Sequence, residues 1–227
     1  MSSSAVWNET WRPKKLDDII GQPVIVNKLK QMVRNGRLTN LILSGPPGTG
    51  KTSCAQAIGH EFFGDRMIGC FKELNASDKK WRGIDMVDAE LKPFATTRPL
   101  YGDVPFKILF LDEADSLTQD ALKALRKPLE KYNRNTRFIF AVNDIDYFSK
   151  TKTGEAILSR FFECKFEPIG REAMINRLKY ISMVEDIHFN DKQYDYIAEM
   201  VPGDLRKSIN LLENMQFQTG DLGNFIR

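Results

Sequence analysis

The chain has few of the residues on which secreted and membrane proteins depend. Its 227 residues include only three cysteines and two histidines. Cys54, Cys70 and Cys164 are an odd set at irregular spacing, which fits neither a disulfide framework nor a zinc site. The longest uninterrupted apolar run, Phe138 to Val142, is too short to cross a membrane, and the first residues lack the pattern of a secretory signal. We therefore expect an intracellular protein with reduced thiols, cytoplasmic in a prokaryote or nuclear in a eukaryote.

The composition is that of a folded protein without a strong charge bias. Apolar residues make up 42% and charged residues 28% of the chain, which predicts a packed core and a solvated surface. The 33 basic and 30 acidic residues leave a net charge of +3, which does not by itself indicate nucleic-acid binding. A chain of this length forms one large domain or two small ones.

Short apolar runs alternate with helical apolar stripes over most of the chain. The runs predict strands at residues 41–43, 71–74, 108–111, 138–142 and 164–166. Stripes with helical spacing lie between them, at residues 25–33, 84–94 and 122–132. Because parallel strands need crossover connections, we predict an α/β fold with a parallel sheet covered by helices on both faces.

The pattern changes after Phe166. Residues 167–170, Glu-Pro-Ile-Gly, form a breaker cluster, and the apolar residues beyond them have helical spacing only. These residues predict three helices, around 175–181, 197–201 and 205–212. We therefore expect an α/β domain over residues 1–167 and a small helical domain over residues 168–227.

A phosphate-binding loop is the strongest motif. Residues 45–52, Gly-Pro-Pro-Gly-Thr-Gly-Lys-Thr, fit the pattern G-x-x-x-x-G-K-[ST] and directly follow an apolar strand. In this motif Lys51 reaches the β- and γ-phosphates of ATP, and the Thr52 hydroxyl binds Mg²⁺. The alternative, a glycine-rich turn with an incidental lysine, is disfavoured by the strand before the loop and the helix-compatible stretch after it. The ATP-binding residues expected here are Gly45, Pro46, Pro47, Gly48, Thr49, Gly50, Lys51, Thr52 and Ser53.

Acidic and amide side chains follow two further predicted strands. Asp112 and Glu113 come directly after one apolar run; Asp112 suits the Mg²⁺ shell, and Glu113 suits a group that polarises the attacking water. Asn143 follows another run, where its amide would orient that water or contact the γ-phosphate. In isolation the two acids would also fit helix caps, and Asn143 would fit the start of a turn. Beside a phosphate loop, the pattern favours a site that hydrolyses ATP.

Several segments together resemble a known family. They read Trp-Arg-Pro (11–13), Leu-Asp-Asp-Ile-Ile-Gly-Gln (16–22), the phosphate loop, Leu-Asn-Ala-Ser-Asp (74–78), Phe-Leu-Asp-Glu-Ala-Asp (110–115), Leu-Thr-Gln-Asp-Ala (117–121), Ser-Arg (159–160) and Gly-Asp-Leu-Arg-Lys-Ser-Ile-Asn (203–210). The chain resembles AAA+ ATPases and, within them, the small subunits of the sliding-clamp loader replication factor C. The resemblance implies the AAA+ fold, a five-stranded parallel P-loop sheet followed by a helical lid, and ATP with Mg²⁺ as cofactors.

The resemblance also implies roles for residues outside the phosphate loop. Asn143 is similar to sensor 1, and Arg206, on the lid, is similar to sensor 2, which reaches the γ-phosphate. Asn75 resembles a switch residue that holds Glu113 unproductive until DNA binds. The residues that resemble the adenine-side wall are Arg12, Pro13, Ile20 and Gly21.

Arg160 resembles an arginine finger that acts in trans. In this family the arginine of Ser-Arg enters the nucleotide site of the next subunit, where such a finger stabilises charge in the transition state. An isolated subunit would then hydrolyse ATP weakly. Without the resemblance, a surface arginine that ends a loop would be the simpler interpretation.

Two basic groups are expected to track DNA phosphates, as the starts of the corresponding helices do in the family. Phosphate contacts fix position without reading sequence, although a solvated helix face is the usual meaning of such charges. The side chain of Trp81 would either stack on a base or pack beneath a helix, and packing is favoured. The loop-like segment 95–105 is a weaker expectation for contact with the clamp. The DNA-binding residues expected are Lys79, Lys80, Arg82, Lys123, Arg126 and Lys127.

The resemblance implies a subunit of an ATP-dependent clamp loader for DNA replication. Its partners would be other clamp-loader subunits in a ring, a pentamer when the collar domain is present, together with the sliding clamp and primer–template DNA, and no membrane. The alternatives are another AAA+ motor on DNA, such as a branch-migration helicase, and a nucleotide-dependent DNA-binding scaffold with negligible hydrolysis. Family members usually continue into a helical collar, so we expect weak self-association of these 227 residues alone.

Some positions depart from the family pattern. Phe161 stands where the family usually has cysteine after Ser-Arg, and Trp11 stands where tyrosine is usual. The segments 79–82 and 151–154 are longer or more basic than expected. These departures affect the expected subunit interface and DNA contacts rather than ATP binding.

Overall fold

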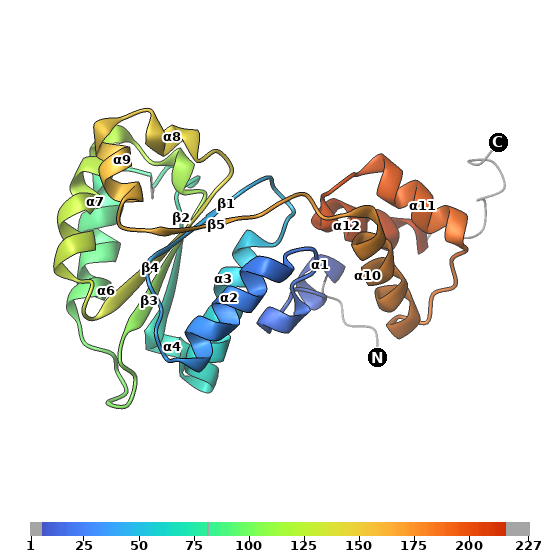
Figure 1. Cartoon of the computed structure of the whole chain (residues 1–227), viewed down its shortest axis with the longest axis horizontal. Helices are drawn as coiled ribbons and strands as arrows, with labels where there is room; N and C mark the ends of the chain where they lie inside the picture. The colour runs from blue at the N-terminus through green and yellow to red at the C-terminus, as the bar shows by residue number, and fades with distance from the viewer. Residues whose placement is uncertain (1–5, 81, 217–227) are drawn as a thin grey trace.

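The computed structural model describes residues 6–80 and 82–216, in which a parallel sheet with helices on both faces is followed by a group of three longer helices (Figure 1). Trp81, for which base stacking and packing are the two expectations, lies outside the described residues. Among the described residues, no helix is long and apolar enough to cross a membrane.

Five parallel strands form the sheet, in the order β2-β3-β4-β1-β5. Their bounds are β1 (Leu41–Ser44), β2 (Phe71–Asn75), β3 (Lys107–Asp112), β4 (Thr136–Val142) and β5 (Phe162–Lys165). The predicted parallel α/β sheet is confirmed, and each strand overlaps the apolar run that predicted it. The bounds differ most at β4 and β5, which begin two residues before the expected 138 and 164. In β5 only Cys164 is buried, so its other positions give little core signal.

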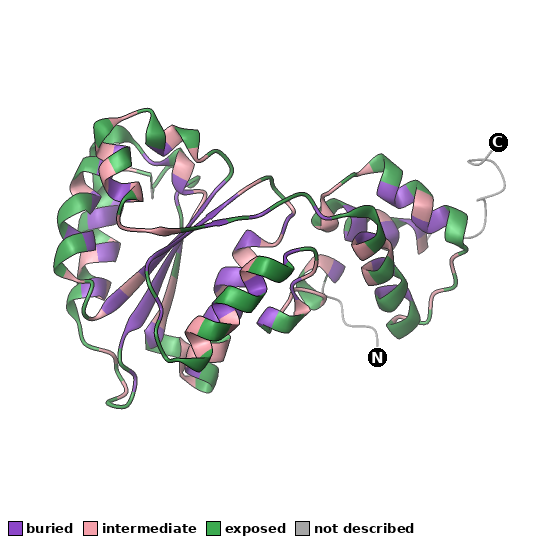
Figure 2. Ribbon diagram, in the orientation of Figure 1, coloured by how far each residue is buried: buried purple, intermediate pink, exposed green. Residues whose placement is uncertain are grey.

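Alternate residues of the strands point to opposite faces, and each face has its own core. Leu41 and Leu43 pack beneath α2 (Pro23–Arg34) and α3 (Lys51–Phe63), with the short α4 (Met67–Cys70) beside them. Ile42 and the residues that share its face lie under the other helical layer. Figure 2 shows buried positions along the strands and on the inner sides of the helices.

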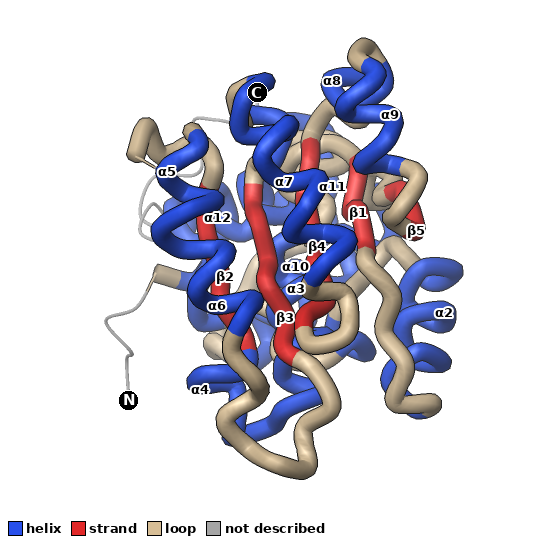
Figure 3. Tube along the Cα trace, turned by 90° about the vertical axis from the view of Figure 1, so that its left-hand side faces the viewer, coloured by secondary structure: helices blue, strands red, loops and turns tan. Residues whose placement is uncertain are grey.

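The second layer, which faces the viewer in Figure 3, is built from short helices around one long one. In α7 the buried Leu122, Leu125 and Leu129 form the predicted stripe, and the Thr118 side chain caps the helix by accepting a 3.2 Å bond from the Ala121 N–H. The bounds are α5 (Ile84–Met86), η3 (Val87–Leu91), α6 (Lys92–Thr96), α7 (Gln119–Lys131), α8 (Asp146–Ser149) and α9 (Lys152–Leu158).

The stripe at residues 84–94 forms one helical run with an irregular middle. Its central part, Val87–Leu91, is a π-helix that ends just before Pro93. Proline has no N–H to give to the preceding turn, so a wider turn before it accommodates the missing hydrogen bond. The described residues also include three short 3-10 turns, which are η1 (Leu16–Asp18), η2 (Gly64–Arg66) and η4 (Ala114–Ser116).

The C-terminal helices have a core of their own. This core is formed by α10 (Arg171–Val184), α11 (Asp191–Met200) and α12 (Leu205–Gln216). The short N-terminal helix α1 (Trp7–Thr10) joins the same core: the Trp7 N–H donates to Glu213, and the Trp11 indole donates to Glu185 at 2.9 Å. The segment from Trp7 to Trp11 therefore packs against the helices at residues 171–216, while the domain boundary near 167 stays a prediction.

The three cysteines are buried and free. Burial raises the pKa of the Cys54 thiol and raises that of Cys164 to about 11, so both thiols stay protonated at neutral pH.

Candidate nucleotide-binding site

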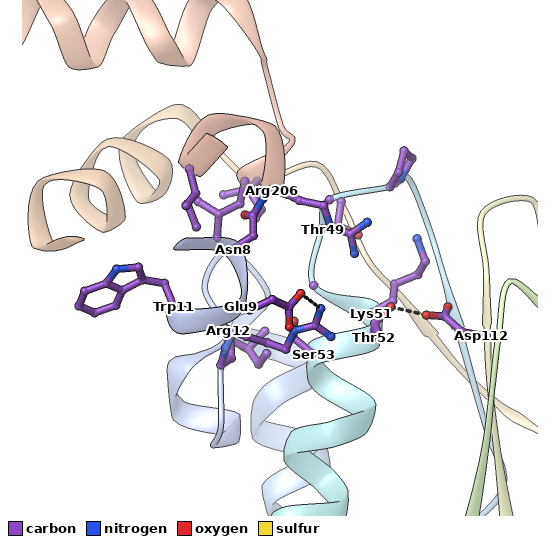
Figure 4. A pocket seen from close by; sticks show the side chains of 18 of the residues that line it. Asn8, Glu9, Trp11, Arg12, Thr49, Lys51, Thr52, Ser53, Asp112 and Arg206 are labelled. Atoms are coloured by element: carbon purple, nitrogen blue, oxygen red, sulfur yellow. Dashed lines mark hydrogen bonds and ion pairs between the residues drawn. The ribbon is translucent and has the colours of Figure 1, made fainter. Parts of the chain in front are cut away.

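A cavity of about 620 Å³ lies where the carboxyl ends of the strands, α1 and α12 meet (Figure 4). The structure brings most of the predicted ATP-site residues into its wall. Those that line it are Arg12, Pro13, Ile20, Pro47, Gly48, Thr49, Gly50, Lys51, Thr52, Ser53, Asn75, Asp112, Glu113, Asn143 and Arg206. Segments far apart in the sequence thus form one hollow of a size suited to a small ligand.

The phosphate loop connects β1 to α3, and two of its glycines are required by close approach. A Cβ on Gly45 would lie 2.2 Å from the carbonyl oxygen of Phe166, and one on Gly48 would lie 1.9 Å from the Asp204 carboxylate. Both glycines also have positive φ, at 140° and 74°. The loop therefore packs closely against both the residue that follows β5 and the turn that precedes α12.

Lys51, in the first turn of α3, has its ammonium group inside the loop. Its Nζ donates to the carbonyl oxygens of Gly45 (2.6 Å) and Pro46 (2.8 Å) and to Oδ1 of Asn143 (2.9 Å). Burial lowers the pKa of Lys51 to about 8, against the opposing effect of the nearby Asp112 and other carboxylates. Gly45 and Pro46 thus hold the lysine through their backbone although neither lines the cavity.

Thr52 and Asp112 offer oxygen ligands of the kind that Mg²⁺ prefers. The Thr52 hydroxyl donates to Oδ2 of Asp112 at 2.7 Å. Neighbouring ligands on octahedral Mg²⁺ with bonds of about 2.1 Å lie about 3 Å apart, so this pair fits two adjacent positions of such a shell. The remaining positions would be taken by water and phosphate oxygens.

Asn75 ends β2, Glu113 directly follows the neighbouring strand β3, and both residues line the cavity. Glu113 has a left-handed backbone with φ of 51°, a strained conformation that is common at functional sites. Asn75 lies opposite Asp112 in the sheet, and its Oδ1 accepts a 2.8 Å bond from the Ser77 N–H. The side chain of Asn75 is therefore engaged in its own turn, so its switch role stays a prediction.

The wall opposite the phosphate loop includes residues that the sequence did not indicate. Arg12 is held by an ion pair with Glu9 (2.6 Å) and a bond to Gln56 (3.3 Å). Gly21, expected in the wall, does not line the cavity, and a Cβ there would approach Ile169. The lining residues not anticipated include Asn8, Glu9 and Trp11 from the N-terminal segment and Leu205, Ile209 and Asn210 from α12. Helical spacing from Arg206 could have indicated Asn210, whereas no motif marks Asn8.

Arg160 lies elsewhere, after α9 and outside the cavity wall. Its guanidinium donates to the Ala156 carbonyl and forms an ion pair with Glu130, which is on α7. The Arg160 side chain is 30% exposed to solvent, so another molecule can reach it.

The two basic groups expected to contact DNA lie side by side on the surface. The Thr118 N–H, at the start of α7, donates to the Arg82 carbonyl oxygen at 2.9 Å, just before α5. All six residues are exposed. Lys123 pairs with Asp120 at 2.9 Å. The segment before α5 therefore adjoins the start of α7, and DNA binding by these six residues, called the basic surface below, stays a prediction.

The segment 95–105, the weaker expectation for clamp contact, is mostly loop and is anchored by a buried lysine. Lys107 is 1% exposed, and its ammonium donates to the Phe94 carbonyl and to the Thr97 hydroxyl (2.7 Å). Leu100, in contrast, is 73% exposed. The loop is thus held by the hydrogen bonds of Lys107 and exposes the apolar side chain of Leu100.

Sequence comparison assigns the family. The profile of the ATPase family associated with various cellular activities (AAA) matches residues 41–164, more than half of the chain. The chain belongs to the AAA family of ATPases. The match runs from β1 to β5 and therefore contains the phosphate loop, Asp112, Glu113 and Asn143.

Curated relatives carry a more specific name. The chain is 45% identical over 208 residues to the replication factor C small subunit of Saccharolobus solfataricus, covering 92% of this chain and 61% of that protein. It is 45% identical over 217 residues to the protein of the same name from Picrophilus torridus, covering 96% of this chain and 65% of that one. The chain thus spans less than two thirds of the length of these relatives.

Solved structures agree on the fold. RuvB of Thermotoga maritima, described as a Holliday junction branch migration motor, superposes with a TM-score of 0.73 at 21% identity, over 94% of this chain and 67% of that one. At this identity the likeness shows a shared AAA fold only.

Proposed function

We propose that this chain is the nucleotide-binding part of a clamp-loader small subunit, which uses ATP to open a sliding clamp and place it on primer–template DNA. The observation that carries the proposal is the agreement between the AAA cavity and the names of relatives 41–45% identical to this chain. Because the chain spans only part of those relatives, the activity of the whole assembly is inferred from them.

Within the cavity, each side chain has one task in ATP hydrolysis. Lys51 exchanges its contacts with Gly45, Pro46 and Asn143 for phosphate oxygens, which are stronger acceptors because they are charged. Thr52 and Asp112 would hold Mg²⁺, which when bound would supply positive charge to neutralise the phosphates. Glu113 polarises the attacking water, and Asn143 orients it.

Arg206 would report on the nucleotide from the C-terminal helices. It lines the cavity from α12, and the neighbouring Leu205 N–H donates to the Gly48 carbonyl of the phosphate loop at 3.2 Å. A γ-phosphate that attracts Arg206 would draw α12 toward the loop, so the helices at residues 171–216 would act as a lid.

Arg160 and the basic surface complete the proposal outside the cavity. Arg160 would act in trans on a neighbouring subunit, which makes the isolated chain a weak, Mg²⁺-dependent ATPase. The six basic residues, which lie before α5 and along α7, would hold DNA phosphates without reading sequence. The ring of subunits and the clamp are the remaining proposed partners.

The test compares ATPase rates of the assembled complex with and without primed DNA and the clamp. The proposal predicts stimulation that needs both together. DNA-driven unwinding would favour a helicase motor of the same family, and a flat rate near zero in every assembly would favour a nucleotide-dependent scaffold.

A further inference from the structure

One carboxylate beside the cavity makes contacts to which the proposed function gives no role. Asp115 is in η4, directly after β3, and does not line the cavity. Its Oδ2 accepts hydrogen bonds from the backbone N–H groups of Asn143 (3.0 Å) and Asp144 (3.1 Å), which follow β4. Asp115 therefore ties together the segments that leave two neighbouring strands.

Asn143, one of the two residues that Asp115 binds, also contacts the lysine of the phosphate loop. Asn143 is the residue whose side-chain Oδ1 accepts the 2.9 Å bond from Lys51 Nζ. Its own backbone is at an exposed strand end that passes into a turn. Two hydrogen bonds thus connect Asp115, through the backbone and side chain of Asn143, to the lysine.

The two oxygens of Asp115 have different surroundings. Oδ2 makes both backbone bonds, whereas Oδ1 is shielded from solvent and has no hydrogen-bond partner among the described residues. A shielded oxygen without a donor is costly, and a charged acceptor strengthens the bonds that its partner oxygen makes. A residue needed only to start a local turn would not require this arrangement.

We propose that Asp115 is a positioning residue for ATP hydrolysis, which fixes the Asn143 amide at the phosphate-loop end of the cavity. Asp115 is not among the residues that line the cavity, so in this proposal it acts through Asn143. The inference rests on the proposed ATPase function. Because small displacements of a positioned group lower rates strongly, removal of the two bonds affects turnover far more than binding.

The experiment compares Asp115→Ala, Asp115→Asn and the control Asp144→Ala in the assembled complex. Asp144 is the next residue along the same turn, and its side chain accepts a 2.9 Å bond from the Asp146 N–H. Three quantities are measured: kcat and KM for ATP, affinity for a non-hydrolysable ATP analogue, and hydrogen exchange of the Asn143 and Asp144 amides.

We expect Asp115→Ala to lower kcat about 10- to 100-fold, change analogue affinity less than about threefold, and speed exchange of the two amides about tenfold or more. Asp115→Asn keeps an oxygen acceptor of the same shape and should recover most of the rate. Asp144→Ala should match the parent in all three quantities.

Three results would overturn the inference. In the first, Asp115→Ala retains the parental kcat and amide exchange. In the second, kcat and analogue affinity fall together and exchange rises across the whole chain, which marks a loss of folding. In the third, Asp115→Asn is no better than the alanine variant. A parent with no ATPase activity would instead refute the proposed function, and the exchange rates alone would then decide whether Asp115 holds the segment.

Discussion

The cavity and the α7 surface differ in how far a single chain completes them. In the cavity, hydrogen bonds of 2.6–2.9 Å connect the side chains of Lys51, Thr52, Asp112 and Asn143 to one another or to the phosphate loop. These residues come from the ends of β3 and β4 and from the loop and helix that follow β1. On the surface of α7, the basic side chains are exposed, and the guanidinium of Arg160 pairs with Glu130 of the same chain.

This difference distinguishes residues whose site is formed within one chain from residues whose proposed role needs a second molecule. The cavity is prearranged by the sheet, since parallel strands bring their carboxyl ends to one edge. The α7 surface has charge and exposure but no enclosure, so under the proposed function it would act only when another molecule supplies the second half of the site. Changes in the cavity should therefore act on the chain's own site, while changes on the surface should act only in an assembly.

The largest effect is expected for Arg160→Ala in a mixed assembly. Removal of a finger that stabilises transition-state charge should slow hydrolysis at the neighbour's site about 10³-fold or more. The ion pair of Arg160 with Glu130 is partly exposed, so exchanging it for a phosphate costs little. Rates in assemblies with the variant at one defined position measure the effect. An equal decrease in the variant's own site would show that Arg160 acts in cis.

Glu113→Gln should keep nucleotide binding and lose turnover. The amide cannot take a proton from water, and removal of such a base costs about 10²- to 10⁴-fold in rate. Single-turnover hydrolysis and analogue binding on the same sample separate the two quantities. A variant that turns over at the parental rate would remove Glu113 from the chemistry.

The basic surface should show itself through salt. Lys123, Arg126 and Lys127 are replaced by alanine. The slope of the logarithm of the DNA-binding constant against the logarithm of salt concentration should then become less steep by about 0.9 for each DNA phosphate that is no longer neutralised. Lys192→Ala, on the exposed side of α11, removes one charge elsewhere and serves as the control. If the control changes the slope as much per residue as the α7 variants do, the surface is only a solvated helix face.

The smallest effect is a proton taken up on binding. With a pKa of about 8, roughly half of Lys51 is neutral at pH 8 in the free protein, and a bound triphosphate raises that pKa. Binding at pH 8 should therefore take up about half a proton more than binding at pH 6.5, where Lys51 is already charged. Calorimetry in buffers of different ionisation enthalpy measures this difference. Equal uptake at both pH values would mean that burial does not depress the pKa.

Local sequence patterns predicted the sheet and the phosphate loop because both are short-range signals. Apolar runs mark buried parallel strands, and the loop motif is contiguous. Asn8 on α1 and Trp11 directly after it were missed because their placement depends on packing against the C-terminal helices, which are far away in the sequence. Asp115 belongs to a motif of the sequence, but its bonds to the turn after β4 follow only from the adjacency of β3 and β4.

The most direct test of the account is the affinity of an ATP analogue with Mg²⁺ for the parent and for Lys51→Ala. The account predicts saturable binding by the parent and a decrease in affinity of about 100-fold or more in the variant, because the buried ammonium group supplies charge-assisted bonds to the phosphates. Equal affinity in a variant that remains folded would contradict the assignment of the cavity as the nucleotide site.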